Sequence, residues 1–167
     1  MKIPIQLEPA AGTATAVEYR WDPDTEILSA HLHPRATGKG LSGSVELEGS
    51  DGSWLILDIS SGRINGVEVA VWPDVQTRRA LKPPVSVEDA SITVPARRSR
   101  PGLAAVEVET PVRAETDESE RVFHFTLGNP RQTRTIRLAS DVLLDVDASN
   151  HLAGLWLLNV PPFQARV

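Results

Sequence analysis

Two stretches of this chain share one pattern, and this repetition constrains the fold more than any other feature of the sequence. Residues 55–72 read LILDISSGRINGVEVAVW, and residues 142–160 read VLLDVDASNHLAGLWLLNV. In each stretch two apolar strands flank a polar turn. An aspartate lies late in the first strand and a glycine at the start of the second; these are Asp58 and Asp145, Gly66 and Gly154. Two copies are too few for a solenoid, so the pattern predicts an internally duplicated domain.

Strand signals also dominate the rest of the chain. Val, Leu, Ile and Thr are frequent, aromatic residues make up 5% of the sequence, and no stretch carries a long apolar period of 3.6 residues. We therefore predict an all-β fold, in which two pseudo-symmetric antiparallel β units pack as a sandwich or barrel-like body with little helix. The common core of the two units is predicted to contain Leu57, Ile59, Val67, Val69, Leu144, Val146, Leu155 and Leu157.

A change of composition separates the two predicted units. The first β repeat covers residues 1–75 and the second covers residues 104–167, with a linker at residues 76–103. This linker is rich in proline and in basic residues, namely Pro83, Pro84, Pro95, Pro101, Arg78, Arg79, Lys82, Arg97, Arg98 and Arg100. Such a basic stretch suits a polyanion, but no aromatic residue is interleaved for base stacking. We expect its arginines to pair with the acidic halves of the chain instead.

The composition also excludes several classes of function. The chain has no cysteine, which rules out disulfides, thiolate catalysis and cysteine-ligated zinc or iron–sulfur sites. A formal net charge of −5 argues against a dedicated nucleic-acid binder. The N-terminal residues lack the apolar core of a signal peptide, and the longest apolar run is far shorter than the roughly 20 residues of a membrane helix. We therefore expect a cytoplasmic protein without membrane contact.

Two motifs resemble a known family. Residues 21–28 read WDPDTEIL and resemble the opening hairpin of a small bacterial family, domain of unknown function 2283. That family opens with an aromatic residue, Asp-Pro, an acidic turn and an apolar strand. Residues 141–158 are similar to its closing motif, although Ser29 replaces a frequent aromatic residue and the second half has lost the Asp-Pro turn. The resemblance implies two degenerate tandem copies of the family's β fold, and it implies no reaction and no functional residue.

Three histidines are the candidates for a metal or small-ligand site. His31 and His33 lie on one face of a predicted strand, a spacing found in some metal sites. His124 lies on the outer face of the matching strand in the second half, and it and Glu26 are conceivable further ligands. A metal site needs at least a third ligand, and the sequence places none beside the first two histidines. We therefore predict that the protein holds no metal and no cofactor.

Asp58 and Asp145 allow two interpretations because they occupy matching positions. Paired carboxylates near a pseudo-twofold axis share a proton in aspartic proteases. Those enzymes place the aspartate in an Asp-Thr-Gly or Asp-Ser-Gly loop, whereas the sequences here are Asp-Ile-Ser and Asp-Val-Asp. The simpler interpretation is that each carboxylate ends a strand and accepts hydrogen bonds from the backbone amides of the turn.

The last strand of the chain is apolar on both faces. Leu155 and Leu157 face one way, and Trp156, Leu158 and Val160 face the other, whereas the first copy has Glu68 at the place of Trp156. A strand of a sheet that faces water should alternate with polar residues. We therefore expect the other half, a second subunit or a partner protein to cover Trp156, and we favour the other half.

No catalytic residues emerge from these patterns. The sequence favours a non-enzymatic structural or protein-interaction module, for which a protein partner or self-association is expected. The first alternative is a small-ligand or metal-binding protein that uses an outer face around His31, His33, His124 and Trp156. A hydrolase is the second alternative, although no acid–base constellation assembles in the sequence.

Overall fold

The described part of the protein consists of β-strands and their connections. The computed structural model describes residues 3–9, 15–34, 42–95 and 105–163, and the strands in these ranges form two sheets. One sheet has the spatial order β2 (Ala16–Asp22), β3 (Ile27–His33), β6 (Arg63–Val71), β5 (Trp54–Ser60), β4 (Gly43–Glu48) and β9 (Ala105–Glu109). The other has the order β1 (Gln6–Pro9), β8 (Glu88–Thr93), β12 (Thr133–Ala139), β13 (Val142–Asp147), β14 (Leu152–Leu157), β11 (Phe123–Leu127), β10 (Val112–Thr116) and β7 (Val75–Thr77). The predicted all-β fold is confirmed.

No helix in the described ranges is long and apolar enough to cross a membrane.

Both sheets are mixed. β7 pairs with β10 in parallel, β8 pairs with β12 in parallel, and β9 pairs with β4 in parallel. Parallel neighbours cannot be joined by a tight hairpin and need a crossover connection. All pairs among β2 to β6, and all pairs among β10 to β14, are antiparallel.

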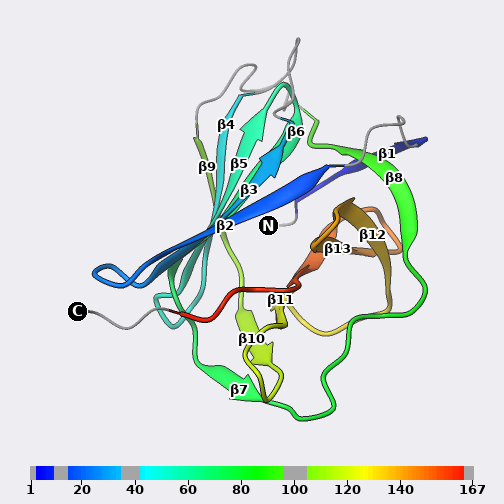
Figure 1. The fold of residues 1–167 in the computed structure, drawn as a ribbon. Helices are drawn as coiled ribbons and strands as arrows, with labels where there is room; N and C mark the ends of the chain where they lie inside the picture. The colour runs from blue at the N-terminus through cyan, green and yellow to red at the C-terminus, as the bar shows by residue number, and fades with distance from the viewer. Residues whose placement is uncertain (1–2, 10–14, 35–41, 96–104, 164–167) are drawn as a thin grey trace.

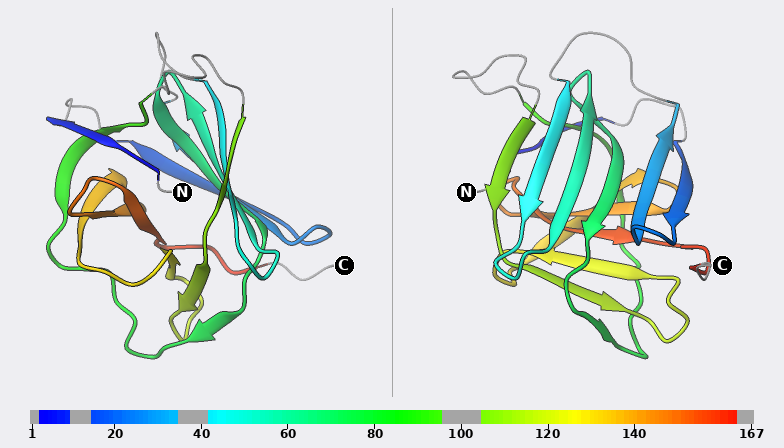
Figure 2. Two further views of the ribbon diagram at one scale, coloured as in Figure 1. Left: turned by 180° about the vertical axis from the view of Figure 1, so that it is seen from behind. Right: turned by 90° about the vertical axis from the view of Figure 1, so that its left-hand side faces the viewer.

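The two sheets pack as a sandwich around one hydrophobic core (Figure 1). In the right-hand view of Figure 2 the strands of the six-stranded sheet run vertically and those of the eight-stranded sheet run across them, as in orthogonal sheet packings. Every residue of the predicted common core is buried, and Leu57, Val69, Leu144 and Leu155 are 0% exposed. The predicted core is therefore confirmed, and the sandwich is the form that it takes.

The same strand order occurs once in each sheet. The six-stranded sheet contains the order β2-β3-β6-β5-β4, and the eight-stranded sheet contains β12-β13-β14-β11-β10, which is the same arrangement when β10 is matched with β2. Asp58 pairs with Gly66 next to a bulge, and Asp145 pairs with Gly154 next to a bulge in the matching hairpin. These matches define equivalent positions in the two sheets. The origin of the chain by duplication stays a prediction.

The segment between the two halves takes part in the sandwich. It supplies β8, while β7 begins at Val75 and β9 pairs with β4. Residues 96–104, with Arg97, Arg98 and Arg100, lie outside the described residues. The division into two repeats and a linker stays a prediction.

Residues 78–87, here named the crossing segment, connect β7 at one edge of the eight-stranded sheet to β8 near the other edge. Five strands, from β10 to β12, lie between β7 and β8. Figures 1 and 2 show the crossing segment on the outside of these strands, away from the six-stranded sheet. The central strands β13 and β14 are buried on both faces, whereas β10 and β12 each keep exposed residues.

Candidate functional site

A cluster of polar side chains surrounds Asp145 on the outer face of the eight-stranded sheet. Asp145 lies opposite Gly154 in the β13–β14 pair, and it is only 6% exposed. Thr135 Oγ1 donates to Asp145 Oδ1 at 3.0 Å, and Trp156 Nε1 donates to the same oxygen at 3.3 Å. His124 Nε2 lies 2.7 Å from Asp145 Oδ2 and donates to it, because a carboxylate only accepts. Strands β12, β14 and β11 thus each direct one donor to a single carboxylate.

Trp156 is buried by its own chain. Its indole ring stacks on the His124 imidazole with 3.9 Å between the ring centroids and 12° between the planes. Trp156 is 5% exposed and its cross-strand neighbour Leu143 is 2% exposed, although both side chains face away from the main core. The crossing segment runs along this side of the sheet (Figure 1). The predicted need for cover is therefore met within the chain.

Position 154 has no room for a side chain, because the Phe125 carbonyl oxygen and the Asp145 carboxylate lie close to it. A Cβ atom at Gly154 would lie 2.6 Å from the Phe125 carbonyl oxygen and 2.9 Å from Asp145 Oδ2. A Cβ at the equivalent Gly66 would lie 3.2 Å from the Ala30 oxygen, with its next contact at 3.6 Å.

We expect Gly154→Ala to lower the free energy of unfolding by about 1–3 kcal/mol, as overpacking commonly does. Gly66→Ala is the matched control and should cost clearly less, because its clash is milder. Urea denaturation of the two variants measures the difference. Equal losses at the two glycines would contradict the close packing around Asp145.

For Asp145 the turn interpretation is wrong, and the turn role belongs to Asp147, two residues further on. Asp145 lies within its strand and accepts from side chains of neighbouring strands. Asp147 has the turn role, since its Oδ1 accepts from the Ser149 and His151 amides while Arg131 Nε donates to Oδ2 at 2.9 Å. Burial raises the pKa of Asp147, but the hydrogen bonds from His151, Arg131 and Ser149 outweigh burial and leave its pKa below the usual value.

In the Asp145 cluster a carboxylate orients the imidazole of His124, but no described hydroxyl group is placed to react with its help. A buried carboxylate that holds a histidine is the support found in hydrolytic triads. Among the described residues no hydroxyl group is hydrogen-bonded to His124, since Thr135 donates to Asp145 instead. What this arrangement does chemically is to tie β11, β12, β13 and β14 together through one polar network.

The structure separates the four candidate ligand residues into two places. His124 and Trp156 lie together on the eight-stranded sheet, whereas His31 and His33 lie in β3 of the six-stranded sheet. His33 Nε2 lies 3.2 Å from Glu18 Oε2. The described residues contain no group of three or more His, Asp or Glu side chains that could hold a metal ion.

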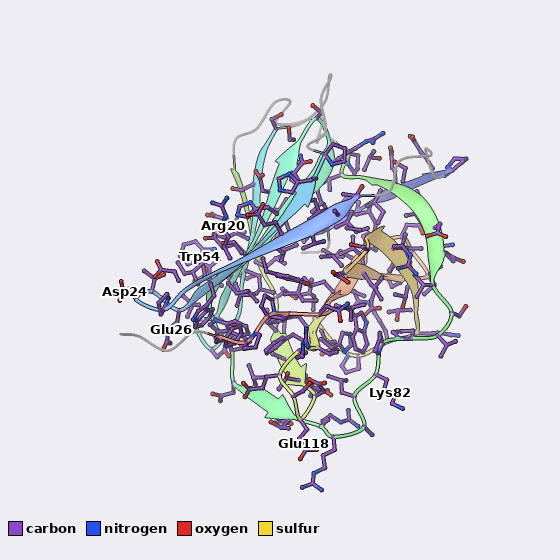
Figure 3. The ribbon with its side chains drawn as sticks, viewed as in Figure 1. Arg20, Asp24, Glu26, Trp54, Lys82 and Glu118 are labelled. Atoms are coloured by element: carbon purple, nitrogen blue, oxygen red, sulfur yellow. The ribbon has the colours of Figure 1, made fainter. Side chains whose placement is uncertain are left out.

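The outer face of the six-stranded sheet is open and carries an apolar strip. Trp54 and Ile56 alternate with buried residues along β5, and Val71 of β6 lies opposite Trp54. Trp54 is 38% exposed and Val71 is 46% exposed, whereas the other described tryptophans are more buried. Figure 3 shows Trp54 and Arg20 on the side of this sheet that faces away from the eight-stranded sheet.

Glutamates flank the apolar strip on both sides. In β4, Glu46 lies opposite Ile56 and Glu48 lies opposite Trp54, while Glu68 of β6 lies on the other side of Ile56. Glu109 of β9 lies next to Glu48. No ion pair within the described residues involves Glu46, Glu48, Glu68 or Glu109. The neighbouring strands β2 and β3 carry a single basic residue of the arginine or lysine type, Arg20. We call Trp54, Ile56, Val71 and these four glutamates the acidic face.

The acidic face and the Asp145 cluster occupy equivalent positions in the two sheets. Glu68 follows Gly66 by two residues, as Trp156 follows Gly154. Ser29 lies opposite Glu68, as His124 lies opposite Trp156. The same face is therefore filled and covered in one sheet, and polar and open in the other. Sequence reasoning missed the acidic face, although the alternation Val45-Glu46-Leu47-Glu48 was a signal for a solvated outer side.

A hollow of about 380 Å³ opens between the two sheets at one end of the sandwich. Ile3, Leu127 and Leu152 contribute its apolar part, and Arg131 lies at its margin. The Arg131 guanidinium donates to Asp147 and to the carbonyl oxygens of Leu127, Asn129 and Leu152. Four of its five N–H donors are thus used within the protein, so this arginine mainly holds the loop and strand ends around the hollow.

Comparison with known proteins leaves the acidic face as the main guide to function. No protein-family model matches the chain, and no curated protein matches it.

Proposed function

We propose that this protein is a non-enzymatic interaction module that binds a basic protein segment on the acidic face. The observation that carries the proposal is the exposed strip of Trp54 and Val71 between glutamates without ion pairs. A monomer rarely leaves a large apolar patch exposed unless the patch binds something. In the Asp145 cluster, in contrast, no described hydroxyl group is hydrogen-bonded to His124, and the cluster supports a structural role.

The chemistry of the acidic face favours a partner with lysine or arginine side chains. A cation above the face of an exposed tryptophan gains about 0.5–1 kcal/mol. Each exposed ion pair with Glu46, Glu48, Glu68 or Glu109 adds about 0.2–1 kcal/mol. Clustered charge of one sign also raises the rate of association with an oppositely charged partner. Several such contacts together are enough for a specific but reversible complex.

The same charges argue against self-association through the acidic face. A twofold dimer brings the same patch of both subunits together. Glu46, Glu48 and Glu68 would then meet their own copies, and like charges that oppose each other are destabilising. The partner is therefore a different surface, and the acidic face belongs to a complex between unlike molecules.

A tandem origin of the two sheets is part of the same proposal. It is supported by the shared strand order and by the matching Asp58–Gly66 and Asp145–Gly154 pairs. The resemblance of residues 21–28 and 141–158 to domain of unknown function 2283 would then reflect one ancestral unit. On this view one copy kept its outer face for binding, and the other became the covered half of the sandwich.

Charge reversal on the acidic face tests the proposal. The probe is a lysine-rich peptide of sixteen residues, and backbone amide chemical shifts report where it binds. We expect shifts in β4, β5 and β6, and an affinity lowered about tenfold by Glu46→Lys with Glu68→Lys, since two attractions become repulsions. Trp54→Ala should lower the affinity several-fold through the lost cation–π contact.

Glu8→Lys with Glu120→Lys is the matched control, because it changes the net charge equally at two exposed positions of the other sheet. This control should change the affinity less than about twofold at moderate salt, where distant charges are screened. Equal losses in the two double variants would show a general charge effect and would contradict binding at the acidic face.

A further inference from the structure

The crossing segment shows how this sandwich covers the outer face of a sheet. It reads RRALKPPVSV, with three basic residues and two adjacent prolines. It lies over the eight-stranded sheet at the face that is equivalent to the acidic face of the six-stranded sheet. A basic, proline-containing segment thus crosses one of two equivalent faces, and the described residues include no such segment across the other.

The crossing segment has little length to spare. It begins with a turn, in which the Leu81 amide donates to the Arg78 carbonyl oxygen at 3.0 Å. Six inter-strand steps separate β7 from β8 in the sheet order, which is roughly 29 Å at about 4.8 Å for each step. A chain of about ten residues spans at most about 33–36 Å. The part of the segment that follows the turn therefore crosses the strands almost directly.

Ion pairs attach the start of the crossing segment to the sheet. Arg78 Nη1 lies 3.0 Å from Glu115 Oε2, and the Arg78 amide donates to the Thr116 carbonyl oxygen at 2.8 Å. Arg79 Nε lies 3.9 Å from Glu118 Oε1. Glu115 is the cross-strand neighbour of His124, so the first arginine is held at the border of the Asp145 cluster. These pairs agree with the expectation that arginines of this segment contact acidic residues of the chain.

Prolines suit a segment that crosses a sheet face. The strands beneath such a segment already pair with one another, so the backbone amides of the segment have no strand to pair with. A proline, which has no amide N–H, therefore sacrifices no hydrogen bond there. Proline also favours the extended polyproline II conformation before binding, which reduces the entropy lost on binding. Aromatic surfaces are common receptors for such segments.

From these observations we infer that the acidic face binds an extended, basic, proline-containing segment of another protein, laid across the strands as the crossing segment is laid across the eight-stranded sheet. The inference rests on the proposed function and adds the form of the partner. Trp54 and Ile56 provide the apolar platform, and Ile56 occupies the position that Leu143 has on the other sheet. Glu46, Glu48, Glu68 and Glu109 take the role that Glu115 and Glu118 have for the two arginines.

Synthetic peptides test this inference with the full-length protein. The probe is a peptide of the sequence RRALKPPVSV, and the control peptide RRALKAAVSV replaces its two prolines by alanine. We expect the first peptide to shift the amide signals of β4, β5 and β6, and the control peptide to bind about fivefold more weakly, since each proline removes freedom from the unbound peptide. The Glu46→Lys, Glu68→Lys variant should lose binding of both peptides.

Each other outcome has a distinct meaning. If the lysine-rich peptide binds the acidic face and the two decapeptides bind equally, the proposed function stands and the inference about extended partners fails. If none of the peptides binds, both fail. Shifts in β13 and β14 would mean that the decapeptide replaces the crossing segment on its own sheet, which also overturns the inference. A mass that doubles with concentration in light scattering, without added peptide, would identify a second copy as the occupant and would overturn it as well.

Discussion

Trp156→Glu is expected to abolish the folded state or to lower its stability by about 4–5 kcal/mol or more, the range reached when an unpaired charge is buried. The indole is 5% exposed, stacks on His124 and donates to Asp145. A glutamate at this position would place a second carboxylate beside Asp145 and would leave the imidazole without its stacking partner. Since small domains have only about 5–15 kcal/mol of stability, most of it would be lost. Far-UV circular dichroism with thermal denaturation measures the effect.

Trp54→Glu is the matched control for this experiment. Trp54 is 38% exposed on the acidic face, so the same substitution there should change the free energy of unfolding by no more than about 0.5–1 kcal/mol. Light scattering on both variants separates a change of fold from a change of assembly. A folded Trp156→Glu variant with the stability of the parent protein would show that the outer face of the eight-stranded sheet is not sealed at Trp156, and would contradict the burial of this side chain.

Asp145→Ala is expected to cost about 3–5 kcal/mol, as the removal of one partner from a buried polar pair commonly does. The substitution deletes the acceptor of Thr135, Trp156 and His124 at once. It leaves three donors of different strands without a partner in a place that water barely reaches, and unsatisfied buried groups carry most of the cost. Urea denaturation monitored by tryptophan fluorescence gives the free energy of unfolding.

Asp145→Asn is the conservative control for Asp145. The amide keeps an oxygen that accepts from Thr135 and Trp156, but its nitrogen turns a second donor toward His124. We expect a loss of about 1–3 kcal/mol, which is the scale of one unsatisfied buried group. Losses of equal size for alanine and asparagine would show that the His124 contact alone determines the stability of the cluster. A loss below about 0.5 kcal/mol for alanine would show that the network is not structural.

The strands could be predicted where their side chains alternate or form short apolar runs. The hairpin with the WDPDTEIL turn and the strands around Asp58 and Asp145 lie where the pattern places them. β10 and the short strands β1 and β7 were missed. β7 and β10 pair with each other in parallel, and β1 pairs with β8 across a long stretch of sequence. Such pairings depend on segments that are remote in sequence, so a local pattern carries little signal for them.

The candidate site depends even more on contacts between segments that are remote in sequence. The sequence identified Trp156 as a residue that needs cover and His124 as a residue on an outer face. It assigned a turn role to Asp145, because an aspartate near a strand end has nearby backbone amides as its obvious partners. The actual partners, Thr135, Trp156 and His124, come from three other strands. The acidic face was missed because Glu46, Glu48, Glu68 and Glu109 become neighbours only through strand register.

The sequence by itself determined that this chain is all-β, with a repeated Asp–Gly hairpin and a core of alternating Leu, Ile and Val residues. Periodicity of two is a local property, and burial of one face follows from it. Only the tertiary structure decided that the basic segment between the halves crosses one sheet, while Trp54 and Val71 on the equivalent face of the other sheet are exposed. The path of a connection depends on where its two end strands are inserted in the sheet. That insertion is set by parallel pairing of β7 with β10 and of β8 with β12, which no local pattern specifies.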